Sequence, residues 1–333
     1  MGDTLVKTSS AALGAAMLVL VFSGCGGGGG GGAPLPPSGP PATGTINTGS
    51  VLAVTGRSMD AAFRSSRFGD ITNVVGLTTV SASDPATLGA GTISKPGGWT
   101  AWSEIPVGPE TTSCIVNGTV TVSGDIASPL VVRAGDFLDY EWEDCDDGLG
   151  QVINGHIGLT FTEFDGNLLA GRILLGVSLV VDNFQVSEST EFNLTNGDLS
   201  LIIDSRTQPE TTIKTIGTSL IISDGISTET LKDYSSTVTE DTSMFPSNFT
   251  TEATGRVTSS QFSGEVSYDT PVAFQSSGGG YPYAGEMLIF GTGGSNVRII
   301  AMDEVNVRIE ADYNGDGASD ATIETSWAAL VDG

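Results

Sequence analysis

The amino-acid sequence predicts a mainly β fold: a long antiparallel meander curled into a barrel, a half-barrel or a sandwich, with one short helix near the N-terminus. From about Thr112 to Trp327 the chain is a series of short apolar runs rich in Val, Ile, Thr and aromatic residues. This composition is typical of strands, and turn dipeptides separate the runs at regular intervals. Apolar and polar residues also alternate within several runs, which indicates strands with one buried face.

The turn dipeptides predict how the strands are connected. Asn-Gly and Asp-Gly supply the positive φ angles that tight hairpin turns need, so each strand should pair with its neighbour along the chain. We expect turns at Asn117-Gly118, Gly135-Asp136, Asp147-Gly148, Asn154-Gly155, Asp165-Gly166, Asn196-Gly197, Asp224-Gly225, Gly293-Gly294 and Asn314-Gly315. A meander of this length has a large apolar face, which curling, closure or folding of the sheet would cover.

The last two strands show the alternation most clearly. Val305, Val307, Ile309 and Ala311 should face one side, and the polar residues between them the other. The next strand repeats the pattern with Ala321, Ile323 and Trp327 on its apolar side.

The only helix expected precedes the strands. Ser58 is suited to be its N-cap, Met59, Ala62 and Phe63 follow at helical spacing, and the helix should end near Gly69. It would lie against the curved sheet.

The N-terminus has the features of an export signal. Lys7 precedes an apolar run over 11–22, which is too short to span a bilayer. The following segment, Val21-Phe22-Ser23-Gly24-Cys25, resembles the lipobox of bacterial lipoproteins. The resemblance implies cleavage before Cys25, acylation of Cys25 and a membrane anchor; the alternative is an ordinary signal peptide and a free Cys25.

A low-complexity segment follows Cys25. A glycine run over 26–32 gives way to a proline-rich stretch, which suits a flexible but extended tether. We therefore divide the chain into a signal peptide (1–24), a tether (25–43) and a single β domain (44–333). The resemblance to lipoproteins, with no Asp after Cys25, implies the outer membrane, with the body on its periplasmic face or at the cell surface.

The remaining cysteines, Cys114 and Cys145, would lie in an oxidising compartment. We expect them to form a disulfide, the alternative being two buried free thiols. The chain has 39 acidic and 13 basic residues, a formal net charge of -26. This charge repels nucleic acids and anionic lipid headgroups, so neither is an expected partner of the body.

The segment from Asp312 to Asp320 carries the sharpest local motif, Asp-Tyr-Asn-Gly-Asp-Gly-Ala-Ser-Asp. Oxygen ligands at positions one, three, five and nine and a carbonyl at position seven can surround one hard cation. The motif resembles the calcium loops of integrin-type FG-GAP repeats and half of an EF-hand. This resemblance implies a structural calcium ion held by Asp312, Asn314, Asp316, the carbonyl of Ala318, and Asp320; the alternative is an acidic hairpin turn without an ion.

A second acidic group lies between Asp136 and Asp147. In a strand, Asp139, Glu141 and Glu143 share a face with Phe137, so these carboxylates should face solvent. The only histidine, His156, has no Gly-x-Ser-x-Gly motif or spare cysteine to work with. We therefore expect neither a catalytic triad nor, with so few His and Cys, a zinc site.

Three functions are compatible with these features. The first is a non-enzymatic binding or structural module of the cell envelope, anchored by lipid, with an envelope protein as a candidate partner. The second is a carrier in which the curved sheet holds a lipid or another apolar ligand. The third is an acid-type hydrolase using Glu141 or Glu143, for which the sequence offers no other support.

Overall fold

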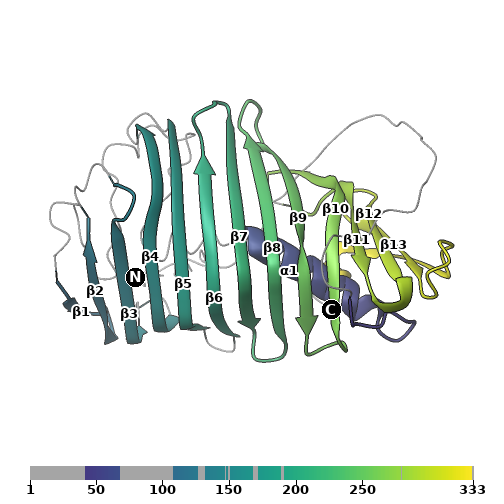
Figure 1. Cartoon of the computed structure of the whole chain (residues 1–333), viewed down its shortest axis with the longest axis horizontal. Coiled ribbons are helices and arrows are strands. Elements are labelled where there is room, and N and C mark those ends of the chain that lie inside the picture. Colours follow the sequence, from purple (N-terminus) through teal and green to yellow (C-terminus); the bar gives the residue numbers. More distant parts are fainter. Residues whose placement is uncertain are drawn as a thin grey trace, which may run out of the picture.

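The computed structural model describes residues 42–67, 108–126, 132–146, 148, 151–167, 172–188, 191–278 and 280–331. Their dominant element is one sheet (Figure 1). Its strands are β1 (Glu110–Ser113), β2 (Asn117–Asp125), β3 (Phe137–Asp146), β4 (Gln151–Asn167), β5 (Arg172–Glu188), β6 (Glu191–Asp204), β7 (Glu210–Ser223), β8 (Thr228–Asp241), β9 (Asn248–Ser259), β10 (Glu265–Ser277), β11 (Ala284–Phe290), β12 (Asn296–Ala301), β13 (Asn306–Asp312) and β14 (Ala321–Ser326).

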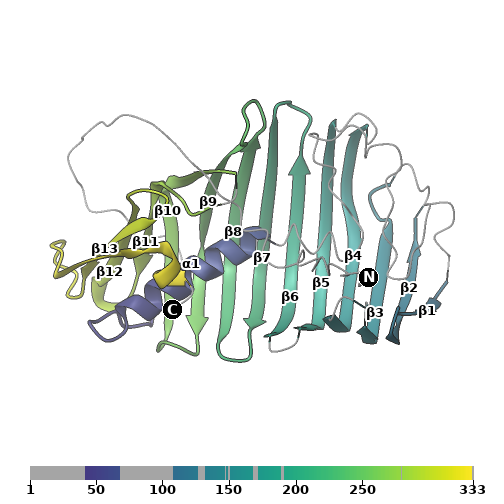
Figure 2. The same cartoon turned by 180° about the vertical axis from the view of Figure 1, so that it is seen from behind.

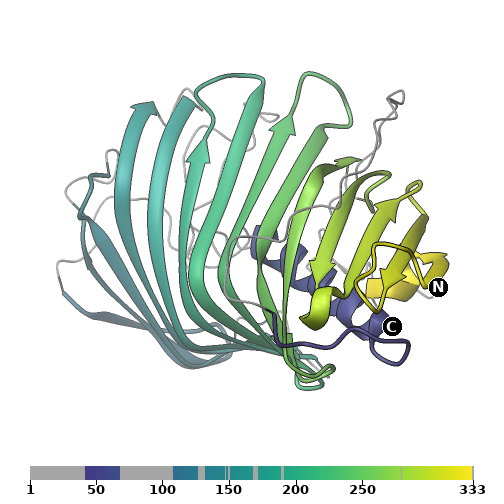
Figure 3. The same ribbon diagram turned by 45° about the vertical axis from the view of Figure 1, so that its right-hand side comes forward.

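The sheet is the predicted antiparallel meander. Its 14 strands are arranged in sequence order, and each described pair of neighbours is antiparallel. Figure 3 shows that the sheet is curved. In the described part of the chain β14 does not pair with β1, so the sheet stays open and is not a barrel.

In the described part of the chain, two α-helices pack beside the sheet. The longer, α1 (Val51–Arg67), crosses one face of it diagonally (Figure 2) and packs mainly against β7, β8, β9 and β12. We call the face that carries α1 the inner face. The shorter helix, α3 (Trp327–Val331), follows β14 and contacts α1. A Cβ at Gly56 would lie 2.5 Å from the carbonyl oxygen of Leu330, so glycine permits this close approach of the two helices.

The predicted start of the helix is wrong. Ser58 is not an N-cap; it lies inside α1 and is fully buried. The helix begins at Val51, after a turn in which Asn47 Oδ1 accepts the Gly49 N–H at 2.8 Å. Serine is common at N-caps, but its side chain is also small enough to fit where a helix packs closely on a sheet. Ser58 occupies a position of this second kind.

Several Asn-Gly and Asp-Gly pairs are not hairpin turns. The pairs at 117–118, 154–155, 165–166 and 196–197 lie inside strands. The ladder changes register beside Gly118, Gly155 and Gly197, which have positive φ angles of 78°, 101° and 139°. These glycines therefore form β-bulges, which use the same backbone conformation as a turn. The strands are longer than expected as a result.

Alternation predicts the faces of the last strands well. Val307, Ile309 and Ala311 are buried on the inner face of β13. Two residues depart from the prediction: Val305 lies in the β12–β13 connection with 61% of its surface exposed, and Trp327 begins α3 after the end of β14.

Candidate functional site

The inner face of β3 to β7 is a continuous apolar surface. Because side chains alternate along a strand, every second residue of these strands points to this face, and the alternation shifts by one residue at a bulge, as between Val181 and Phe184. The residues that it buries are Leu138, Tyr140, Trp142, Ile157, Leu159, Phe161, Leu175, Val177, Leu179, Val181, Phe184, Leu199, Leu201, Ile203, Leu220 and Ile222. Burial raises the pKa of the Tyr140 hydroxyl, which keeps it neutral.

Helix α1 covers the other half of the inner face. Val54 and Met59 are fully buried, and the ring of Phe63 lies 5.8 Å from that of Phe274 on β10. The main contacts of α1 begin at β7 and extend toward β12. The apolar surface on β3 to β6 therefore lies mainly beyond this helix.

An ionic cluster fixes α1 to one end of the sheet. Arg57 Nε lies 3.8 Å from Oε1 of Glu229, whose side chain is only 2% exposed. The same carboxylate accepts hydrogen bonds from Ser259 at 3.1 Å and Ser227 at 3.4 Å. A buried carboxylate needs such partners, so the cluster determines where the helix lies.

The acidic residues of β3 lie on the outer face. Leu138, Tyr140 and Trp142 are buried, whereas Glu141 and Glu143 are exposed, as the alternation predicts. Nε2 of His156 lies 2.6 Å from Oδ1 of Asp139, and both side chains are more than one-third exposed. This pair therefore lies on an open surface of the sheet.

The Asp312–Asp320 loop connects β13 and β14, as expected for a β-hairpin loop. Oδ1 of Asp312 accepts the N–H groups of Asn314 at 3.2 Å and Gly315 at 2.7 Å, and Oδ2 accepts that of Gly317 at 2.8 Å. Asn296 also donates to Oδ2, at 3.2 Å. Burial alone would raise the pKa of Asp312, but these donors together lower it below its ordinary value.

The donor set of this loop suits a hard cation, but its side chains are spread out. Asp316 and Asp320 are exposed, and Asp320 Oδ2 accepts the N–H of Tyr313 at 2.8 Å. Among the described residues, no group of three or more His, Cys, Asp or Glu side chains is placed to hold a metal ion. Coordination of calcium would require Asp316 and Asp320 to turn toward Asp312.

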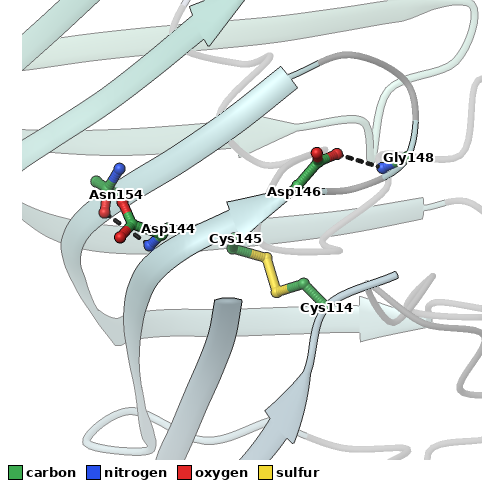
Figure 4. Close-up of a disulfide and its surroundings, with 6 residues drawn as sticks. All are labelled: Cys114, Asp144, Cys145, Asp146, Gly148 and Asn154. Carbon is green, nitrogen blue, oxygen red and sulfur yellow. Dashed lines mark hydrogen bonds between the residues drawn. A yellow bond between two sulfur atoms is a disulfide. The ribbon is translucent and has the colours of Figure 1, made fainter. Parts of the chain in front are cut away.

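The two cysteines lie at disulfide-bonding distance, in agreement with the predicted pairing. Figure 4 shows Cys114, at the end of β1, joined to Cys145 on β3, with a Cα–Cα distance of 5.4 Å. The bond ties the edge hairpin β1–β2 to the third strand. Nearby, Asn154 Oδ1 accepts the N–H of Asp144 and Asp146 Oδ1 that of Gly148, at 2.8 and 2.9 Å.

The proposed lipidation site, Cys25, lies outside the described residues. The described chain joins the sheet almost at once, because the N–H groups of Thr43 and Gly44 donate to the carbonyl of Glu265 at 3.0 and 2.8 Å. No helix in the described ranges combines the length and the apolar composition needed to cross a membrane.

Two features of the inner face were not predicted. The Arg57–Glu229 contact joins residues far apart in the sequence, and no local pattern marks it. Hydroxyl residues such as Thr215 and Ser236 occupy inner positions of β7 and β8, each only 1% exposed. Counting alternate residues from Leu220 and Leu231 could have placed these hydroxyl residues on the inner face, but the bulges interrupt the alternation.

The buried residues of the inner face belong to one hydrophobic core cluster that also contains Cys114 and Cys145, whereas the Asp-rich loop lies at the β13–β14 connection. Comparison of this chain with protein-family models, with curated proteins and with solved structures found no match.

Proposed function

We propose that the protein is an envelope lipoprotein whose β domain is a non-enzymatic binding module, and that it carries an apolar ligand on its inner face. The observation that supports this function is the apolar inner face of β3 to β6, which lies beyond the main contacts of α1 and whose side chains are nevertheless at most 8% exposed. Apolar surface of this extent is typical of ligand sites and of cores, and an open curved sheet can accept a ligand between its strands and a covering segment.

Native mass spectrometry tests the proposal. The full chain with Cys25→Ser, purified from the periplasm, should carry an apolar adduct that organic solvent releases. If the protein has no adduct and binds no apolar probe such as 1-anilinonaphthalene-8-sulfonate, its own residues fill this face and the module is structural.

A matched pair of substitutions on β5 locates the site. Val181 is 3% exposed on the inner face, and its neighbour Val180 is 55% exposed on the outer face. Val181→Thr adds a polar atom at nearly constant volume and should weaken binding of the probe, whereas Val180→Thr should leave it unchanged. Equal effects of the two substitutions would place the probe elsewhere.

We propose that Cys25 anchors the protein in the outer membrane, on the basis of the lipobox-like segment. Cells fed labelled palmitate should incorporate the label into the wild-type protein and not into Cys25→Ser. Recovery of both forms from the soluble fraction would contradict the anchor.

We also propose that the Asp312–Asp320 loop binds calcium as a structural ion. The support is a donor set of three carboxylates, one amide and one carbonyl in a loop that Asp312 already organises. The native mass should gain one calcium, and Asp316→Ala should abolish the gain. Glu324→Gln, on the adjoining strand β14, is the control and should retain the ion; a bare mass in excess calcium would rule the site out.

A further inference from the structure

A cavity of about 370 Å³ lies at the end of the sheet where the described chain begins. Its walls come from β8, β9, β10, the β9–β10 connection and the segment before α1, and they include Thr43, Lys232, Thr258 and Glu265. The β9–β10 connection is at the lower edge of the sheet in Figure 1. Small-molecule sites begin at about 300 Å³, so the cavity has room for a small polar molecule or a lipid head.

The cavity opens on the outer face of the sheet, apart from the apolar inner face. Lys232 and Thr258 alternate with Leu231 and Val257, which are fully buried on the inner face. The Lys232 side chain is 42% exposed. Its charged group can therefore be reached from solvent.

The cavity has hydrogen-bond donors for an anion. Lys232 Nζ donates one bond to Oε2 of Glu265 at 2.9 Å and makes no other within the described residues. An ammonium group has three N–H donors, so two remain. The Thr258 hydroxyl makes no hydrogen bond in the described part of the chain, and the Thr43 hydroxyl accepts the N–H of Glu265 at 3.1 Å, which leaves its proton for a ligand. These donors suit the oxygens of a phosphate group.

The cavity also presents a negative charge. The Glu265 side chain is 14% exposed, and Arg256 donates to its Oε1 at 2.7 Å. Burial alone would raise the pKa of Glu265, but the hydrogen bonds from Lys232 and Arg256 lower it below its ordinary value. A carboxylate oxygen can accept two hydrogen bonds, so Glu265 can accept a further donor such as an ammonium group.

The charge of the whole chain favours a ligand without net charge. The formal net charge of -26 repels anionic molecules and surfaces. A head with one phosphate and one ammonium group is neutral overall, and its two charges match those of Lys232 and Glu265. The cavity therefore suits a zwitterion better than a simple anion.

The cavity adjoins the point where the tether meets the β domain. The N–H groups of Thr43 and Gly44 donate to the carbonyl of Glu265 at 3.0 and 2.8 Å. A Cβ at Gly264 would lie 2.5 Å from Gly44 Cα, so no side chain fits between the two segments. A coil as long as the tether (25–43) spans roughly 25 Å, so a lipid on Cys25 would keep this end of the sheet near the membrane surface.

We propose that this cavity binds the phosphoethanolamine head of a membrane phospholipid. The phosphate would accept hydrogen bonds from Lys232 and Thr258, and the ammonium group would donate to Glu265. The assignment adds a second site to the domain. It rests on the proposed lipid anchor, which brings the cavity to the membrane.

Co-sedimentation with vesicles tests the ligand class. The full chain carrying Cys25→Ser should bind vesicles of phosphatidylethanolamine and phosphatidylcholine in equal parts about tenfold more tightly than vesicles of phosphatidylcholine alone, because choline has no N–H to donate to Glu265. Vesicles of phosphatidylglycerol and phosphatidylcholine offer the phosphate without the ammonium group and should bind no better than phosphatidylcholine alone. Equal binding to the three kinds of vesicle would overturn the proposal.

Soluble glycerophosphoethanolamine distinguishes the source of the head. It should displace the chain from the vesicles, because it occupies the same cavity. If it binds the protein while no vesicle does, the ligand is a soluble phosphate ester and the proposal of a membrane lipid is overturned.

Two substitutions locate the head in the cavity. Lys232→Met removes the cation, and Thr258→Val removes one hydroxyl at nearly constant volume. Each should weaken binding to phosphatidylethanolamine vesicles by about tenfold. The control is Lys214→Met, at an exposed position of β7 that does not line the cavity, and it should bind like the parent.

The unfolding midpoint separates a binding effect from a folding defect. Arg256 still pairs with Glu265 in Lys232→Met, and Thr258→Val removes a hydroxyl that bonds to no described residue, so both midpoints should stay close to that of the parent. Unchanged binding by the two folded variants would overturn the proposal.

The vesicle experiment and the palmitate experiment can fail separately, because Cys25→Ser has no anchor. Vesicle binding by a protein that incorporates no palmitate would overturn the anchor and, with it, the proposed route of the cavity to the membrane. Palmitate incorporation without vesicle binding would overturn the cavity proposal and leave the anchor in place.

Discussion

At the scale of single residues, glycine allows an aromatic side chain of one strand to lie across the backbone of the neighbouring strand. Tyr234 is 1% exposed and lies across Gly217, its partner on β7. Its hydroxyl donates to the carbonyl of Asp198 at 3.0 Å. The ring therefore occupies the space that a side chain at position 217 would need.

Gly217→Ala should destabilise the protein. The new Cβ would lie 2.2 Å from the Tyr234 hydroxyl oxygen and 2.3 Å from Cζ, so the ring must move and its hydrogen bond to Asp198 be strained. We expect a loss of about 1 to 3 kcal/mol in the free energy of unfolding, measured in urea. Gly108→Ala is the control, because nothing lies within 4 Å of a Cβ there; equal losses would contradict the explanation.

Asp312 should make stability depend on pH in the acid range. Its pKa is lowered from the ordinary 3.8 because, against the effect of burial, four N–H donors stabilise the carboxylate. The stabilisation is then fully present above pH 3.8 and is lost as the pH falls through the lower, folded-state value. The difference in unfolding free energy between wild type and Asp312→Asn should therefore shrink below this pH. A constant difference would show that the carboxylate charge is not responsible.

At the scale of elements, the edge hairpin is the part of the sheet most dependent on a covalent bond. Strand β1 has only 4 residues, and its burial pattern includes no buried residue. Cys114 and Cys145 connect it to β3. Packing alone therefore contributes little to holding β1 in place.

Replacing both cysteines with serine should lower the free energy of unfolding by roughly 3 to 4 kcal/mol in the chain-entropy model, for a sequence separation of 31 residues. Denaturant unfolding of the oxidised wild type and of the double variant measures this difference in the free energy of unfolding. Reduced wild type should match the variant; if reduction has no effect, the bond contributes nothing to the fold.

Arg57→Ala should detach α1 from the end of the sheet. It leaves Glu229 buried without its cation, which typically costs about 3 kcal/mol or more, although Arg57 is 22% exposed and solvent moderates the loss. Adding Glu229→Gln should restore part of the lost free energy of unfolding, because it removes the buried charge that Arg57 no longer compensates. A purely additive double variant would mean that the two side chains are not coupled.

Sequence patterns predicted the elements better than their ends. The alternation of Val307, Ile309 and Ala311 identified the buried face correctly because one simple period governs it. A hairpin turn was predicted at Asn154-Gly155, where the structure has a β-bulge, because both structures need a glycine with a positive φ angle. Thr215 and Ser236 were missed because Ser and Thr are common on exposed faces, and only the register of the finished sheet places them inside.

At the scale of the whole molecule, the net charge affects the stability of the fold. The formal net charge is -26, so a compact structure brings many like charges together and repels itself. Several cations are already engaged in local pairs, such as Arg298 with Glu286 at 2.7 Å, but acidic residues outnumber them.

Salt should therefore stabilise the protein. Raising the NaCl concentration from low to physiological levels shortens the Debye length to about 8 Å and screens this repulsion. The thermal midpoint should rise, and rise equally with KCl, since the effect is one of ionic strength. A midpoint that falls with added salt would mean that attractive ion pairs dominate instead.

The meander also makes the width of the sheet adjustable. Each strand pairs only with the strands before and after it in the chain, so a hairpin can be inserted or deleted without changing the register of the strands on either side. Every added hairpin would widen the inner face by two strand spacings, about 10 Å. An architecture of this kind can be lengthened in fixed steps over evolutionary time, much as a repeat protein grows by whole units.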